Sequence, residues 1–111
     1  MKDAEKVVRE IEDFYEEFRG RTQYGRKLEM PKLPLLRAKL LSVCTHEYVM
    51  EKWTSLEDAC KQLSRQRQPK GFNESNVISW GLGDVGNIRS WMARLGLVDD
   101  FRERDEQQSS D

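Results

Sequence analysis

Apolar residues recur every three or four positions over the first twenty residues, which is the spacing of one face of an α-helix. The stripe consists of Val7, Ile11, Phe14 and Phe18. Acidic residues dominate the early turns, where the helix dipole favours them, and Gly20 is expected to end the helix. Residues 1–20 are therefore predicted to form an amphipathic N-terminal helix.

The next segment contains glycine and proline, so residues 21–33 are predicted to form a basic connector. Proline is suited to a first helical turn, and a second helix is expected to begin at about Pro34. Its apolar positions continue at helical spacing, and we expect it to run to about Lys52 or Trp53. This is the most hydrophobic helix of the chain, and we place it at the centre of the core.

A third helix is predicted where Thr54 is followed three residues later by Glu57, which has the form of a capping box. Its apolar face reaches Leu63. Residues 64–76 then lose the helical periodicity and contain Pro69 and Gly71, so they are predicted to form a long polar loop.

The last helix is predicted to begin at Asp84 as N-cap and to close at Gly96, where a C′ glycine belongs. Its apolar stripe is formed by Val85, Ile88, Met92 and Leu95. Beyond Gly96 there is room for one short strand at most, and residues 101–111 are expected to be a polar flexible tail. The sequence therefore predicts a mainly α fold, a small four-helix domain whose core spans residues 34–100.

Gly81, Gly83 and Gly86 have the G-x-G-x-x-G spacing of a dinucleotide-binding turn, which needs a parallel sheet around it. The residues before the motif show helical patterns, and too few follow it for another crossover and strand. We therefore exclude a nucleotide site here. Gly81 and Gly83 are expected to bracket a turn into the last helix, and Gly86 to lie in its first turn near another element.

Two segments resemble the winged-helix and helix-turn-helix superfamily of DNA-binding domains. Leu56–Leu63 is similar to the second helix of such a domain, and Val85–Val98 to its recognition helix and the glycine turn into the wing. The resemblance covers about residues 36–98, and the linker between the two segments is longer than a standard helix-turn-helix turn. It implies that exposed residues of the last helix face a DNA major groove.

The composition of the chain narrows the classes of protein and of function that remain. The 111 residues suit one domain, and no apolar run is long enough to span a bilayer. Cys44, Cys60 and His46 are too few for a structural zinc site, so the cysteines are expected to be buried thiols. No catalytic motif occurs, and we expect no enzyme activity, no cofactor and no membrane partner. The expected location is the cytoplasm, or the nucleus in a eukaryote.

A formal net charge of −1 conceals two basic clusters. Clustered cations with few acids are what phosphate groups require. The candidate nucleic-acid contacts are Arg21, Arg26 and Lys27 in the connector, Lys61, Arg65, Arg67 and Lys70 in the loop, and Asn87, Arg89, Ser90 and Arg94 on the last helix. Arg89 and Ser90 project away from the apolar stripe and are expected to be exposed.

Two functions follow from these patterns. The first is a non-catalytic nucleic-acid-binding module that contacts duplex DNA through residues 61–70 and 84–95. The alternative is a helical protein-interaction module, or an accessory subunit or homodimer, that docks through Val7, Ile11, Phe14 and Phe18. Such docking needs apolar anchors at helical spacing on an accessible face.

Overall fold

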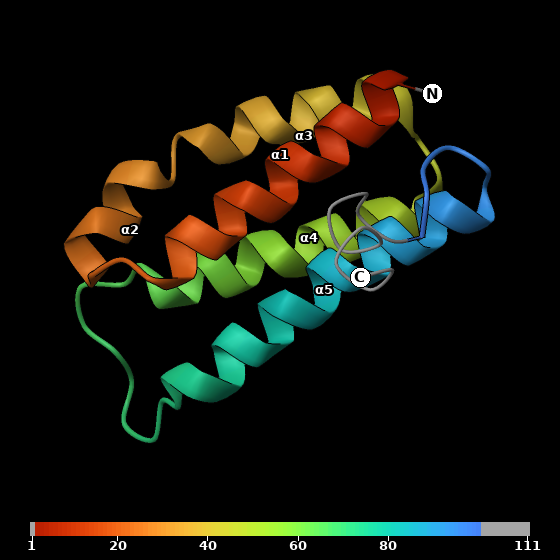
Figure 1. Cartoon of the computed structure of the whole chain (residues 1–111). Coiled ribbons are helices and arrows are strands. Elements are labelled where there is room, and N and C mark those ends of the chain that lie inside the picture. The colour runs from red at the N-terminus through yellow and green to blue at the C-terminus, as the bar shows by residue number, and fades with distance from the viewer. Residues whose placement is uncertain (1, 101–111) are drawn as a thin grey trace, which may run out of the picture.

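The computed structural model describes residues 2–100, which form five α-helices and no strand. These helices are α1 (Lys2–Arg19), α2 (Gln23–Glu29), α3 (Lys32–Val43), α4 (Glu47–Leu63) and α5 (Glu74–Arg94). The predicted mainly α class is confirmed. The helices lie in two layers (Figure 1): α1 and α3 run antiparallel in one, and α4 and α5 run antiparallel in the other.

The apolar stripe of α1 faces the protein's own core, against α3 and α5. Val7 is 7% exposed, Ile11 1% and Phe18 0%, and only Phe14 of the four keeps partial exposure. The end of this helix at Arg19, before Gly20, agrees with the prediction. The stripe predicted to dock onto a partner therefore packs against the chain's own helices, with three of its four side chains buried inside the domain.

The pair formed by α4 and α5 makes the most extensive helix contact of the fold. One face of α4 buries an apolar residue every three or four positions, namely Val49, Trp53, Leu56, Cys60 and Leu63. On α5 the corresponding positions are Val77, Gly81, Val85, Ile88 and Met92. Each large side chain buried in this seam contributes about 1.5–3 kcal/mol relative to the exposed state.

The single helix expected from Pro34 to Trp53 is two helices. Cys44 leaves the helical conformation with φ −157° and ψ 123°, and His46 caps α4 by accepting a hydrogen bond from the Tyr48 amide at 3.3 Å. Apolar residues keep helical spacing on both sides of this break, so periodicity alone does not reveal it. Thr54 is not an N-cap but lies inside α4, where its hydroxyl donates to the Met50 carbonyl.

The basic connector contains a helix of its own. Thr22 caps α2 by accepting a hydrogen bond from the Gly25 amide at 3.1 Å. The following helix, α3, begins at Lys32, so Pro34 lies in its first turn, as expected, but is not its first residue.

A ten-residue loop, 64–73, connects α4 to α5, and the last helix begins much earlier than expected. Asn73 is its N-cap and accepts a hydrogen bond from the Asn76 amide at 3.1 Å. Asp84 is therefore not a cap but a residue in the middle of the helix, 6% exposed. The three fingerprint glycines also lie inside α5, so the expected turn at Gly81 and Gly83 does not exist.

Gly81 is required by a close approach between α1 and α5. The buried hydroxyl of Tyr15 donates to the Ile78 carbonyl at 2.9 Å, and a Cβ at position 81 would overlap that hydroxyl. A Cβ at Gly83 or Gly86 would meet nothing within 4 Å. The first glycine of the motif thus serves packing, whereas the other two lie on an open helix face.

The predicted end of α5 is confirmed. Gly96 has φ +77°, its amide donates to the Ala93 carbonyl at 2.9 Å, and the Leu97 amide donates to the Met92 carbonyl at 2.9 Å. This is a Schellman motif. Residues 97–100 form no strand, and the predicted tail at 101–111 lies outside the described residues.

Two other expectations concern burial and membranes. Cys44 and Cys60 are buried free thiols, as predicted, and burial raises the pKa of Cys60 to about 12. Across the described part of the chain, no helix has both the length and the apolarity that crossing a bilayer requires.

Candidate nucleic-acid interface

The two basic segments of the sequence meet at one end of the molecule. The side-chain amide of Gln23, on α2, donates to the main-chain carbonyl of Arg65 at 2.7 Å. In Figure 1 this end lies at the left, where α2 and the loop that follows α4 come together. The contact joins residues 42 positions apart in the sequence and places two cationic segments side by side.

Arg26 fastens this end to the core. Its guanidinium donates to the carbonyls of Phe18 at 3.3 Å, Arg19 at 2.7 Å and Leu63 at 3.3 Å, and it pairs with Glu74 at 2.6 Å. These carbonyls belong to the last turns of α1 and α4, whose unpaired oxygens carry the negative ends of the helix dipoles. At 3% exposure Arg26 cannot reach a ligand, so its place among the predicted phosphate contacts is wrong.

Five cations of the two segments remain exposed, and we call them the basic end: Lys27, Lys61, Arg65, Arg67 and Lys70. Within residues 2–100, none of the five forms an ion pair. Arg21 differs, because it pairs with Glu17 at 3.6 Å and Glu29 at 3.2 Å. The basic end therefore keeps uncompensated positive charge, whereas the charge of Arg21 is already matched.

A hollow of about 620 Å³ opens between α2 and the start of the loop. It is lined by Gln23, Tyr24, Lys27, Leu28, Pro31, Ser64 and Gln66. No acidic side chain lines it, and Lys27 contributes one member of the basic end to its wall. The hollow thus combines apolar surface, amide groups and positive charge.

The polar candidates on α5 lie away from the basic end. Asn87, Ser90 and Arg94 are exposed, as expected. At 1.5 Å per residue, Ser90 lies about 25 Å along the helix from its N-cap at Asn73. Arg94 rests over the Trp91 ring at 5.1 Å, and Asp100 lines the same hollow as Ser90 and Arg94. The structure therefore does not bring the two halves of the expected DNA contact together.

Arg89 is buried, at 5% exposure, and the expectation that it is exposed is wrong. It faces α1, where Nε and Nη2 donate to the Glu12 carboxylate at 2.7 and 3.0 Å. Nη1 and Nη2 donate to Glu5 at 3.1 and 2.7 Å, and Nη1 also donates to the Asp99 carbonyl at 2.6 Å. Arg89 is a structural residue that joins α1 and α5.

The charged groups of this cluster stabilise one another in their ionised forms. Burial opposes the charge of Arg89, yet the hydrogen bonds that it donates to Glu12 and Glu5 raise its pKa above the ordinary value. In return, the hydrogen bond from Arg89 lowers the pKa of Glu5 to about 2, against the opposing effect of burial. The cluster is thus held in its ionised form.

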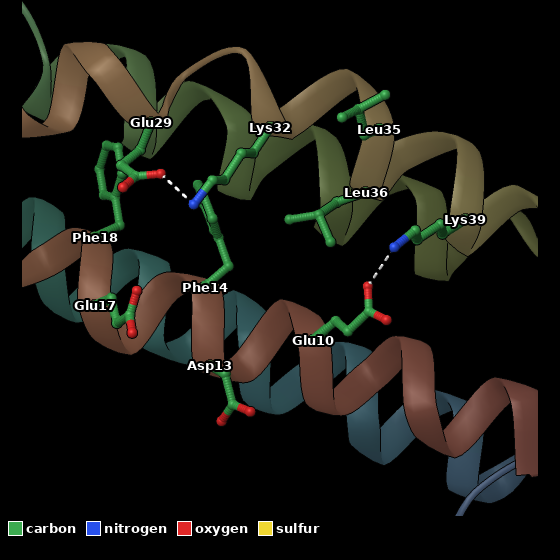
Figure 2. A pocket seen from close by; sticks show the side chains of 10 residues that line it. All are labelled: Glu10, Asp13, Phe14, Glu17, Phe18, Glu29, Lys32, Leu35, Leu36 and Lys39. Atoms are coloured by element: carbon green, nitrogen blue, oxygen red, sulfur yellow. Dashed lines mark hydrogen bonds and ion pairs between the residues drawn. The ribbon is translucent and has the colours of Figure 1, made fainter.

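A second hollow, of about 340 Å³, lies between α1 and α3. Figure 2 shows Phe14 and Leu36 pointing into it, with Lys32 paired to Glu29 and Lys39 paired to Glu10. Both lysines of this groove are thus compensated by acids of the same chain. The groove therefore has less uncompensated positive charge with which to bind an anionic ligand than the basic end has.

The structure also bears on metal sites and buried acids. Over residues 2–100, no group of three or more His, Cys, Asp and Glu side chains is placed to hold a metal ion.

Burial raises the pKa of Asp84, with an opposing effect of its hydrogen bond with Ser55. Among the described residues, Oδ2 of Asp84 has no hydrogen-bond partner. Asp84 is buried between α4 and α5, away from the basic end.

Sequence reasoning missed Gln23 and the hollow beside Tyr24. Tyr24 lies between Arg21 and Arg26 in the sequence, but only the fold shows that it shares a hollow with Ser64 and Gln66. Gln23 carried no recognisable signal, because its role depends on a main-chain carbonyl that is remote in sequence.

Comparisons of this chain with protein-family models, with curated proteins and with solved structures find no match. The resemblance to the winged-helix superfamily stays a prediction that these comparisons do not test.

Proposed function

We propose that this protein is a non-catalytic nucleic-acid-binding module that contacts phosphate groups through the basic end. The observation that carries the proposal is the Gln23–Arg65 hydrogen bond, since it brings the cationic loop segment into contact with α2, which carries Lys27. Lysine and arginine bind the phosphate backbone by displacing counterions, and several cations close together are needed for measurable affinity.

The arrangement favours the basic end over the helix that the sequence indicated. Residues 84–95 offer one exposed cation, Arg94, and an acid beside it, Asp100. The basic end offers five exposed cations, and Arg26 on α2 donates to the Leu63 carbonyl at the end of α4, just before the cationic loop. Phosphate contacts are therefore assigned to Lys27, Lys61, Arg65, Arg67 and Lys70.

Fluorescence anisotropy with a labelled oligonucleotide tests this function. Affinity should fall steeply between about 50 and 300 mM salt, because counterions are released on binding. The variant Arg65→Gln/Arg67→Gln/Lys70→Gln should lower affinity at least about tenfold and flatten the salt slope by about 2 to 3. The variant Arg37→Gln/Arg94→Gln, which removes exposed cations elsewhere, should bind like the wild type.

Three results would contradict the proposal. One is an absence of binding at about 50 mM salt, where phosphate contacts are strongest. Another is an equal loss of affinity per charge removed in the two variants, which would mean that only overall charge matters. Competition by polyglutamate as effective as by unlabelled oligonucleotide would assign the surface to acidic peptides instead.

A further inference from the structure

We infer that the hollow beside Tyr24 receives an unpaired base, so that the ligand of the basic end is a single strand. The inference rests on the proposed function and names the form of nucleic acid that the same surface takes. It is carried by two exposed apolar side chains placed among cations on α2.

Tyr24 and Leu28 are four positions apart and therefore lie on one face of α2. They are 72% and 62% exposed, while Arg26, on the opposite face of the same helix, is buried. The short helix thus turns Arg26 inward, while its aromatic ring and Lys27 face outward. Two large apolar side chains on one exposed face form a patch, which is more informative than hydrophobic residues scattered singly over a surface.

The walls of the hollow fit a base and its sugar. Its volume of about 620 Å³ falls within the range of sites that enclose small organic molecules. Tyr24, Leu28 and Pro31 supply apolar surface for stacking, and the amide of Gln66 can hydrogen bond to the edge of a base.

Charge complementarity identifies the occupant. Lys27 lines the hollow, and Gln66 is flanked in the chain by Arg65 and Arg67, both exposed. No carboxylate lines the hollow to repel a phosphate. A cationic track beside an aromatic side chain is the arrangement by which proteins bind single strands, with bases stacked on the ring and phosphates on the cations.

A duplex cannot use this surface in the same way, because its bases are stacked inside the helix and Tyr24 would face only sugar and phosphate. The preference for a single strand should therefore depend on the tyrosine ring. The cations, in contrast, should contribute to the binding of both forms.

The test compares an oligothymidine with a hairpin duplex of equal charge, by anisotropy at one salt concentration. The wild type should bind the single strand more tightly. Tyr24→Ala should weaken single-strand binding by about tenfold, whereas Tyr24→Phe, which keeps the ring, should stay within about twofold. Neither variant should change duplex binding, and their thermal unfolding should match the wild type because Tyr24 is exposed.

The outcomes separate the inference from the function on which it rests. Binding of neither oligonucleotide overturns both. A duplex bound as tightly as the single strand, or a Tyr24→Ala variant that binds the single strand like the wild type, overturns the inference alone. When the inference alone is overturned, a loss of affinity in Arg65→Gln/Arg67→Gln/Lys70→Gln still supports the proposed function.

Discussion

Arg89 on α5 and Glu12 on α1 form a two-pronged ion pair, with Nε–O and Nη2–O distances of 2.7 and 3.0 Å. The residues are 77 positions apart, and Arg89 contacts Glu5, about two helical turns earlier on α1, through the same guanidinium. The pair fixes the first helix to the last. This explains why an arginine that follows an apolar residue on α5 is buried rather than available to a ligand.

Removal of Arg89 should destabilise the fold severely. Arg89→Ala removes the buried guanidinium that the carboxylates of Glu5 and Glu12 share, although Glu5 keeps its ion pair with Arg9, and we expect a loss of about 3–5 kcal/mol in the free energy of unfolding. Arg94→Ala, at an exposed cation of the same helix, should cost less than about 1 kcal/mol. Urea unfolding followed by tryptophan fluorescence measures both, and a small effect of Arg89→Ala would show that the cluster does not hold α1 in place.

Glu5 should make stability depend on pH. Because the hydrogen bond from Arg89 lowers its folded-state pKa to about 2, from an ordinary value of 4.5, the carboxylate stabilises the fold above the unfolded-state pKa. That contribution should be lost as the pH falls from about 5 toward 2. Unfolding free energies across this range should decline less steeply in Glu5→Gln than in the wild type. The matched exposed variant Glu51→Gln should keep the wild-type slope, and a shared slope in all three proteins would contradict the assignment.

The three glycines of the fingerprint spacing should respond differently to alanine. Gly81→Ala should destabilise the protein by about 1–3 kcal/mol, since the new Cβ displaces the Tyr15 hydroxyl from its bond to Ile78. Gly83→Ala and Gly86→Ala should each stabilise it by about 0.5–1 kcal/mol, because alanine favours a helix interior and the space is open. Thermal unfolding of the three variants decides the matter, and a uniform effect would contradict the packing assigned to Gly81.

Arg26 and Glu74 should contribute unequally to the stability of the fold, although they form one ion pair. Arg26→Ala removes the guanidinium donor from the carbonyls of Phe18, Arg19 and Leu63, of which only that of Phe18 also accepts from a main-chain amide within residues 2–100, and we expect a loss of about 2–4 kcal/mol in the free energy of unfolding. Glu74→Gln should cost less than about 1 kcal/mol, since the Glu74 side chain is 57% exposed. Equal losses in chemical unfolding would mean that the ion pair, and not the capping of two helix ends, is what stabilises this region.

Local patterns in the sequence predicted the features that local interactions determine. Three such predictions are confirmed: the amphipathic stripe of α1, the polar loop after Leu63 and the end of α5 at a C′ glycine, Gly96. Periodicity and capping act over a few residues, so a short stretch of sequence is enough to reveal them. The break between α3 and α4 was missed, since apolar spacing continues through it. The start of α5 was also missed, because Asp84 has the residue type of a cap while Asn73 provides the cap itself.

The candidate site depended on contacts that local patterns do not encode. The cations within residues 61–70 are exposed, but the contact of this segment with α2 depends on Gln23 and Arg26, whose main-chain partners are remote in sequence. The burial of Arg89 depends on acids 77 and 84 positions away, so its own helix offered no indication of it. Tertiary pairing of charges, rather than the charges themselves, separates structural arginines from available ones.

The most direct measurement of the central claim is a titration of the labelled protein with oligothymidine, followed by amide chemical shifts in NMR. We predict shifts at residues 21–28 and 61–72, which saturate together and diminish with salt, and no shifts at Ser90 and Arg94. Shifts that gather on residues 84–95, or no shifts at all under low salt, would contradict the assignment of the basic end as the nucleic-acid interface.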